Sequence, residues 1–239
     1  NKVKVIDCSW HMPAENRNPE EEFKKEHIPS AIFFDLDKNS KNDTDLPHML
    51  PAMNEWNKIV SNLGISKEDH IIIYDNSNVI SSCRCWYNFI YFGHDPKLIS
   101  VLDGGFRKWK QENKKTSNEI IKFLKTEYMG QELTSLVKDK VKINNNISKK
   151  EFVVIDARSK ERFEGKVPDP RKNVRSGSIP NSICLPFMQV INEDYSFKNA
   201  VELKSLFENT LEKPTDKPVF SCGSGVTACV LALAYSLVN

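Results

Sequence analysis

Several features that would place this 239-residue chain in a specialised class are missing. Its 34 basic and 32 acidic residues nearly balance, and no basic stripe with interleaved aromatic residues marks a nucleic-acid-binding surface. The longest apolar run, from Val226 to Val238, is too short and too interrupted to span a bilayer. The first ten residues read as a strand rather than as a signal peptide. We therefore expect neither nucleic acid nor membrane as a partner.

The chain also lacks the cysteine spacing of a disulfide framework or of a zinc site. Its six cysteines are spread along the whole sequence. Cys83 and Cys85 are separated by one residue, whereas a zinc knuckle needs two or more. The pattern is typical of an intracellular protein with reduced thiols, cytoplasmic or mitochondrial. We expect no metal and no other cofactor.

An internal repeat organises what is present. Segments 3–7, 27–32 and 71–75 resemble segments 152–156, 178–183 and 217–222 in the same order. Asp7 and Asp156 are 149 positions apart, and Asp75 and Cys222 are 147 positions apart. Matching segments that occur in the same order and at nearly the same separation along the chain indicate a duplicated domain.

In each copy, short β-branched runs alternate with helical patterns such as 51–63 and 201–211. This alternation predicts an α/β fold with two tandem domains, each a mainly parallel sheet flanked by helices. We place the N-terminal domain at 1–117, a polar linker with one or two amphipathic helices at 118–145, and the C-terminal domain at 146–239.

One cysteine lies where a chain would place a nucleophile. Residues 219–221 are predicted to end a buried strand, and an apolar helix is expected from Val226 onward. Between them lies Cys222-Gly223-Ser224-Gly225, whose small residues let the backbone curl around the sulfur. Backbone N–H groups at such a strand–turn–helix junction stabilise a thiolate and hold an anion above it. In the first copy Asp75 takes the place of Cys222, so we expect that copy to be non-catalytic.

Further motifs extend this pattern over nearly the whole chain. They are VLDGGFRKW at 101–109, DAR at 156–158, Arg162-Phe163, PDPR at 168–171 and CGSGVT at 222–227. With these motifs the chain resembles the tandem rhodanese-domain sulfurtransferases, and among them the 3-mercaptopyruvate sulfurtransferases. It departs from the family at Ser30, Ser178 and Asn181, and it lacks the family's final strand and ending, which we expect to be trimmed or disordered.

The resemblance implies a role for each matching residue. Cys222 becomes a persulfide, and the loop residues Gly223, Gly225, Val226 and Thr227 surround the transferred sulfur. Arg162 and Arg171 are expected to bind the donor's carboxylate and keto oxygen, a task that suits planar guanidinium groups. Arg158, directly after a strand, is instead expected to form an ion pair within the domain.

A proton relay is also implied by the resemblance. Asp37 would orient His48, and His48 with Ser224 would polarise the ketone or protonate the departing carbon. For His48 the alternative is a hydrogen bond that merely anchors its loop.

The loop also discriminates between possible activities. Thiosulfate-using members of the family carry cationic side chains after the cysteine, whereas this loop has Gly-Ser there. The resemblance therefore implies 3-mercaptopyruvate as donor and thioredoxin, small thiols or cyanide as acceptor, in a monomer or weak dimer. Three alternatives stay open: a thiosulfate sulfurtransferase, a non-catalytic interaction or sulfur-carrier module, and a rhodanese-like phosphatase. The phosphatase needs an arginine at the end of the loop, which is absent here.

Overall fold

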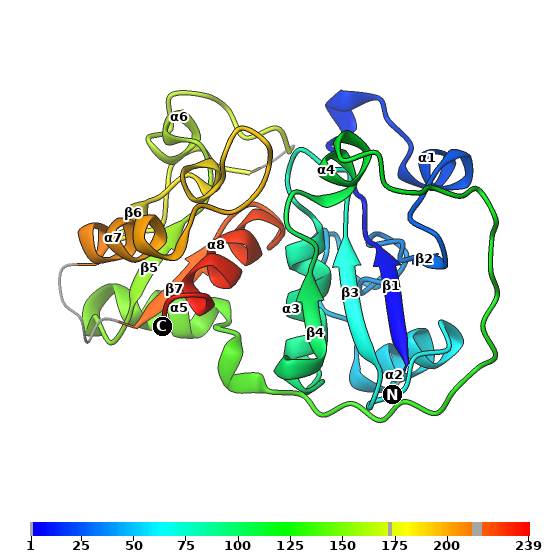
Figure 1. The fold of residues 1–239 in the computed structure, drawn as a ribbon. Coiled ribbons are helices and arrows are strands. Elements are labelled where there is room, and N and C mark those ends of the chain that lie inside the picture. The colour runs from blue at the N-terminus through cyan, green and yellow to red at the C-terminus, as the bar shows by residue number, and fades with distance from the viewer. Residues whose placement is uncertain (1, 172–173, 212–216) are drawn as a thin grey trace. The chain divides into compact units, whose positions relative to one another are not determined.

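The computed structural model describes residues 2–171, 174–211 and 217–239. The chain divides into two compact units. Unit 1 comprises Asn1–Thr134 with Asp194–Ser196, and unit 2 comprises Ser135–Glu193 with Phe197–Asn239. Each unit has its own parallel sheet with helices beside it (Figure 1), so the predicted pair of α/β domains is confirmed.

Among the described residues, unit 1 is built on a four-stranded parallel sheet with the order β2-β1-β3-β4. The strands are β1 (Val3–Asp7), β2 (Ala31–Phe33), β3 (His70–Tyr74) and β4 (Ile99–Val101). The helices are α1 (Pro19–Lys25), α2 (Met53–Asn62), α3 (Ser82–Tyr91) and α4 (Gly105–Gln111), with short 3-10 turns η1 (Pro13–Glu15) and η2 (Pro96–Leu98).

Both faces of this sheet are covered. Phe23 of α1 and Phe106 of α4 pack with Tyr74 of β3 in one apolar cluster. Successive side chains of a strand point to opposite faces, and the alternate residues Ile71 and Ile73 are fully buried as well. A strand that is buried on both faces needs a continuous apolar run, which is what β3 has.

Unit 2 has a three-stranded parallel sheet in its described part, with the order β6-β5-β7. The strands are β5 (Val153–Asp156), β6 (Ile183–Cys184) and β7 (Pro218–Ser221). The helices are α5 (Lys140–Lys149), α6 (Lys160–Phe163), α7 (Ala200–Thr210) and α8 (Thr227–Ser236), with η3 (Thr134–Leu136) at the boundary between the units and η4 (Phe187–Val190).

The strand registers of the two sheets agree residue by residue. In unit 1, Asp7 at the end of β1 is paired with Tyr74 of β3, and in unit 2 Asp156 at the end of β5 is paired with Ser221 of β7. The next residue along β3 is Asp75 and the next along β7 is Cys222. The repeat seen in the sequence is therefore a repeat in three dimensions.

Strand β7 is less buried than the sequence predicts. The apolar segment 219–221 indicates a buried strand, yet every residue of β7 is half-buried. Its counterpart β3 lies between β1 and β4, whereas β7 is the edge strand of the described sheet. The apolar run correctly predicts a strand, but its exposure depends on whether a neighbour covers its outer edge.

The first part of the predicted linker runs along unit 1. Thr126 donates its N–H to the carbonyl of Ser61 over 3.0 Å, and the ring of Tyr128 is buried and stacks on His94. No helix occurs between α4 and η3 in this described stretch. Helix α5 follows near the end of the predicted linker, with the side chain of Asp139 capping its N-terminus.

Candidate active site

Cys222 is the first residue after β7, and five residues separate the strand from α8. The N–H of Gly225 donates to Cys222 Sγ over 3.1 Å, so the loop backbone turns back onto the sulfur as predicted. Gly225 has a φ of +76°, a left-handed conformation that glycine adopts without strain. Cys222 itself is half-buried, which leaves part of its side chain accessible.

The other predicted loop residues complete the turn into α8. Val226 is buried and occupies the N-cap position, and Thr227 is the first residue of the helix. Ser224 lies within the loop, between the two glycines.

A second thiol supports the loop from inside the unit. Cys229 donates its thiol to the carbonyl of Gly225 over 3.0 Å. Cys229 is buried in α8. Both backbone groups of Gly225 are thus engaged, the N–H by one cysteine sulfur and the carbonyl by another.

Arg162 and Arg171 are brought together by a buried carboxylate. Asp169 accepts hydrogen bonds from Arg162 Nη2 at 2.8 Å and from Arg171 Nε at 2.9 Å. The side chain of Asp169 is 1% exposed. Hydrogen bonding to Arg171, and then to Arg162, holds the pKa of this carboxyl well below its usual range. Asp169 is therefore an anion that fixes the orientation of both guanidinium groups.

Sequence reasoning gave no role to Asp169. The signal was present in the motif PDPR at 168–171, since an aspartate two residues before an arginine is close enough to bond it. What the motif does not show is that the same carboxylate also reaches Arg162, seven positions earlier.

Arg158 forms the ion pair that the sequence predicts. Its Nη2 lies 2.7 Å from Oδ2 of the buried Asp156, and it also donates to the carbonyl of Gly177. Hydrogen bonding to Asp156 raises the pKa of Arg158, with smaller electrostatic contributions from Asp169 and from Cys222. Arg158 thus joins the end of β5 to the region of the cysteine loop.

The two predicted substrate-binding arginines contact the loop itself. Arg171 Nη1 donates to the carbonyl of Gly223. A Cβ placed on Gly223 would lie 3.5 Å from the Nη2 atoms of both Arg162 and Arg171. Any longer side chain at this position would have to share space with two guanidinium groups, which gives a physical reason for glycine next to the nucleophile.

This cluster carries more positive than negative charge. The guanidinium groups of Arg158, Arg162 and Arg171 face two carboxylates, Asp156 and Asp169. The surplus cation lies beside the loop that holds Cys222 and favours an anion there.

Asp37 and His48 form a pair in unit 1. His48 Nε2 lies 2.8 Å from Asp37 Oδ1, and Trp10 Nε1 donates to the same carboxylate. Hydrogen bonding to His48 lowers the pKa of Asp37. His48 is buried, has a left-handed backbone with φ of +56°, and accepts a hydrogen bond at its carbonyl from Arg84. Its position is therefore fixed by both its ring and its backbone.

In unit 1 the position of the nucleophile is filled by a carboxylate. Asp75 is buried, and its two oxygens accept hydrogen bonds from the N–H groups of Ser77 and Ser82 at 2.7 and 2.9 Å. Burial raises the pKa of Asp75, and these hydrogen bonds and the charge of Arg107 oppose that effect. The side chain thus bonds the N–H groups of its own loop and of the start of α3.

No group of three or more His, Cys, Asp or Glu side chains within the described residues 2–171, 174–211 and 217–239 is arranged to hold a metal ion. No helix in the same ranges has the length and apolar character needed to cross a membrane.

Known proteins share sequence and fold with both units of this chain. The model of the rhodanese-like domain matches residues 1–112 and 139–238. This chain belongs to the rhodanese family. A relative from Arabidopsis thaliana, named thiosulfate/3-mercaptopyruvate sulfurtransferase 1, mitochondrial, is 39% identical over 97% of the chain and 66% of its own length. The 3-mercaptopyruvate sulfurtransferase of Mus musculus is 38% identical over 97% of the chain and 78% of its own length.

A solved structure shares the rhodanese fold. SseA from Escherichia coli, described as a 3-mercaptopyruvate sulfotransferase, superposes with a TM-score of 0.89 at 28% identity, over 99% of this chain and 88% of that one. The predicted membership of the tandem rhodanese sulfurtransferases, in the 3-mercaptopyruvate sulfurtransferase group, is confirmed. The chain spans about two thirds to four fifths of the length of these curated relatives.

Proposed function

We propose that this rhodanese protein transfers sulfane sulfur from 3-mercaptopyruvate through a persulfide on Cys222 to a thiol acceptor. The Cys222 thiolate attacks the sulfur of the donor, a sulfur–sulfur bond forms, and the carbon–sulfur bond breaks. The electron pair of that bond stays on carbon, giving the enolate of pyruvate, which takes up a proton. An acceptor thiolate then attacks the outer sulfur and restores Cys222, so the kinetics should be ping-pong.

The observation that carries this proposal is the arginine pair held against the cysteine loop. Asp169 fixes the guanidinium groups of Arg162 and Arg171, whose Nη2 atoms each lie 3.5 Å from the position of a Cβ on Gly223. A donor whose sulfur faces Cys222 would have its carboxylate within reach of these cations. Planar guanidinium groups bind a carboxylate through paired hydrogen bonds, which orients the donor for attack.

The choice of donor follows from where the positive charge is attached. The loop residues Gly223 and Ser224 bring no cation, and the nearby cations are arginines from other segments. This separation suits a donor with a carboxylate distant from its sulfur, and it favours 3-mercaptopyruvate over thiosulfate. Thiosulfate remains the second candidate, because the Arabidopsis relatives carry both substrates in their names. The ratio of kcat/KM for the two donors tests the preference, and a ratio in favour of thiosulfate would reverse it.

Asp37, His48 and Ser224 are proposed to supply the proton that the enolate needs. The 2.8 Å contact between Asp37 and His48 supports the first half of this relay. Substituting His48→Gln should lower kcat more than it changes KM, by about 10²-fold for a lost general acid. If instead His48→Gln lowers thermal stability and leaves kcat unchanged, His48 only anchors its loop.

The nucleophile is tested by mass spectrometry of the intact protein. After addition of 3-mercaptopyruvate and removal of excess donor, wild type should gain the mass of one sulfur on a peptide containing Cys222. Cys222→Ser should gain none, and Cys184→Ser, at a half-buried cysteine of the same unit, should behave as wild type. An adduct that persists in Cys222→Ser would exclude the proposed nucleophile.

The arginines are tested by steady-state kinetics. Arg162→Ala or Arg171→Ala should each raise KM for 3-mercaptopyruvate by about 10- to 100-fold, the loss of a charge-assisted hydrogen bond of roughly 1.5–3 kcal/mol. Arg175→Ala is the matched control, since Arg175 is an exposed arginine of the same unit. Unchanged KM in both variants would remove the pair from the substrate site.

The remaining functional assignments are also proposals. Thioredoxin, small thiols and cyanide are the acceptors to compare, by the rate at which each removes sulfur from persulfidated Cys222. A cytoplasmic or mitochondrial location is proposed, with support for the second from the name of the Arabidopsis relative. A monomer or weak dimer is proposed in solution, which sedimentation velocity tests.

A further inference from the structure

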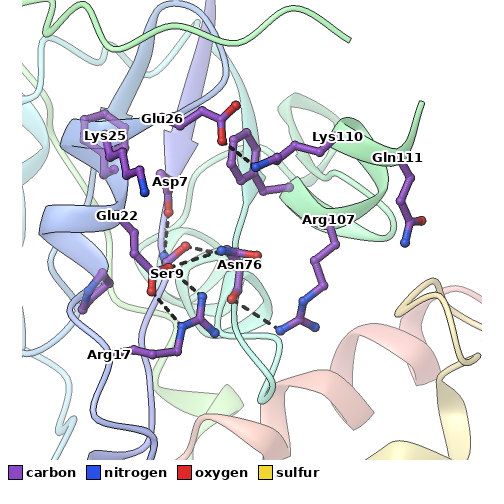
Figure 2. A pocket seen from close by; sticks show the side chains of 13 residues that line it. Asp7, Ser9, Arg17, Glu22, Lys25, Glu26, Asn76, Arg107, Lys110 and Gln111 are labelled. Carbon is purple, nitrogen blue, oxygen red and sulfur yellow. Dashed lines mark hydrogen bonds and ion pairs between the residues drawn. The ribbon is translucent and has the colours of Figure 1, made fainter. Parts of the chain in front are cut away.

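Unit 1 contains a cavity whose lining residues have no role in the chemistry as proposed for Cys222. It has a volume of about 460 Å³ and opens at the carboxyl ends of β1 and β3 (Figure 2). Asp7, Ser9 and Asn76 form its floor, because they end or follow these two strands. Helices α1 and α4 supply its walls.

The place of this cavity in the topology is one that binds ligands in parallel sheets. The chain leaves β1 toward β2 on one side and leaves β3 toward β4 on the other. The gap between the carboxyl ends of β1 and β3 is therefore a topological switch point, where open α/β sheets hold their ligands. In unit 2 the loop of Cys222 begins at the equivalent edge, between β5 and β7.

Part of the cavity lining is a fixed and neutral polar framework. Arg17 donates two hydrogen bonds to Glu22, at 2.7 and 2.6 Å, and Asn76 Nδ2 donates to the same carboxylate at 3.2 Å. Lys110 pairs with Glu26 at 2.5 Å. Figure 2 shows these pairs along the walls. They balance two of the four cations that line the cavity.

The other two cations, Arg107 and Lys25, have no carboxylate at ion-pair distance within the described residues. Arg107 donates to neutral oxygens, Asn78 Oδ1 at 2.6 Å and the carbonyl of Asn76 at 3.5 Å. The ring of Tyr195 covers its guanidinium at 3.9 Å, which holds the plane of the group. Arg107 is thus oriented by neutral partners, and although its charge acts on the buried Asp75 it forms no ion pair within the described residues.

The remaining acid of the lining does not balance this charge. Asp7 lies on the floor, where burial raises its pKa to about 6. Even when Asp7 is ionised, the four cations of the lining exceed its three carboxylates. Phe23 and Phe106 also line the cavity, and the small part of each that is exposed, about 5%, adds apolar surface to it. The excess of positive side chains favours an anion in this cavity. Because two aromatic rings also line it, an organic anion fits better than an inorganic one.

We propose that this cavity of unit 1 binds a small organic carboxylate, held by Arg107 and Lys25 with its carbon chain against Phe23 and Phe106. The site lies in the copy that has Asp75 at the position of Cys222, and it corresponds to the sheet edge from which the Cys222 loop begins in unit 2. Its occupation does not depend on the sulfur-transfer activity proposed above.

The proposal is tested with succinate as probe, on the full chain carrying Arg162→Ala and Arg171→Ala so that the arginine pair of unit 2 is absent. Succinate should bind saturably and shift the backbone amide resonances of Ser9, Asn76 and Arg107. Succinamide, its neutral analogue, should shift none of them. Absence of saturable succinate binding up to about 10 mM, a free energy near 3 kcal/mol, would overturn the proposal.

Two variants test the residues. Arg107→Gln and Lys25→Gln, added singly to this background, should each raise the succinate Kd by about fivefold or more through loss of a charge-assisted hydrogen bond. Lys25 is exposed, so its variant tests the site even if Arg107→Gln disturbs the packing on Tyr195. Lys97→Gln is the control, because η2 precedes β4 and Lys97 lies at the amino edge of the same sheet. Equal weakening by Lys97→Gln would reduce the effect to general charge and refute the site.

Discussion

The two units have the same strand register, but the side chains at the carboxyl ends of their strands differ in chemical character. In unit 2 the buried Asp156 is paired with Arg158, two residues on, and Cys222 follows the neighbouring strand. In unit 1 the equivalent Asp7 has Ser9 two residues on, and Asp75 follows the neighbouring strand. One copy thus concentrates guanidinium groups around a thiol, while the other keeps two buried carboxyls near each other. The fold tolerates both, and the two copies differ in the side chains that follow β1, β3, β5 and β7.

The largest effect is expected at Asp169, a carboxylate of unit 2 that lies outside the comparison of equivalent positions above. Asp169→Asn removes the anion between Arg162 and Arg171 and leaves guanidinium groups without their buried partner. Stability should fall by about 3–5 kcal/mol, and kcat/KM for 3-mercaptopyruvate by about 10²-fold or more. Thermal unfolding and steady-state kinetics measure these changes. Asp194→Asn, at an exposed ion pair with Lys108, should change stability by no more than about 1 kcal/mol.

Asp156→Asn should destabilise the protein by about 3 kcal/mol, because it breaks a buried ion pair and leaves Arg158 with only the more distant Asp169, at 3.9 Å. Asparagine keeps an oxygen for the N–H of Arg158, so the effect reports the charge. Denaturant unfolding at pH 7.5, followed by amide hydrogen exchange in unit 2, gives the value. A loss below about 0.5 kcal/mol would mean that Arg158 finds another anion.

The equivalent change in unit 1 should have the opposite sign. Burial raises the folded-state pKa of Asp7 to about 6 from 3.8, so the native state binds the proton more tightly than the unfolded chain. Asp7 therefore costs stability as pH rises from about 4 through 6, by a total near 3 kcal/mol for a shift of about two pKa units. Asp7→Asn should remove this loss and stabilise unit 1 at pH 7.5.

The measurement for Asp7 is the difference between variant and wild type at pH 4.5 and pH 7.5. Carboxyls with lowered pKa, such as Asp169, contribute in the other direction, but they are unchanged in both proteins and cancel. Equal differences at the two pH values would show that Asp7 carries no extra proton in the native state.

The smallest effect concerns the thiol behind the loop. Cys229→Ala removes the hydrogen bond to the carbonyl of Gly225 and should lower kcat by about two- to tenfold, as a loss of roughly 0.5–1.5 kcal/mol in the orientation of the Gly225 peptide. Cys229→Ser, which keeps a donor, should retain more activity. Cys85→Ala, at a buried thiol of unit 1, should leave kcat unchanged. An equal loss in the alanine and serine variants would assign the effect to packing.

Local patterns predicted much of this structure. The β-branched runs gave the strands, the repeat gave the equivalence of Asp75 and Cys222, and the loop composition gave the turn of Gly225 onto the sulfur. Each of these depends on residues close in sequence or on one repeated order. The ion pair of Arg158 was predictable for the same reason, since its partner lies two positions away.

What escaped prediction depends on contacts between segments. Asp169 reaches Arg162 across a turn, and the direction of a side chain in a loop is not set by spacing. The exposure of β7 depends on its position at the edge of the described sheet rather than on its own residues. The segment after α4 looked like a polar linker because its few anchors, such as Tyr128, are widely spaced among charged residues.

Asp75 uses the backbone donors that surround the position equivalent to Cys222. The loop around a cysteine can bind an anion only from solution. In unit 1 the carboxylate of Asp75 is itself such an anion, and it is covalently part of the chain and hydrogen-bonded to the amides of Ser77 and Ser82. The carboxylate of Asp75 therefore satisfies these two N–H groups and leaves them unavailable to an incoming sulfur compound. The substitution Asp75→Cys would remove the acid and install a thiol together, but Asn76-Ser77-Asn78 would still follow it in place of the Gly-Ser-Gly that follows Cys222.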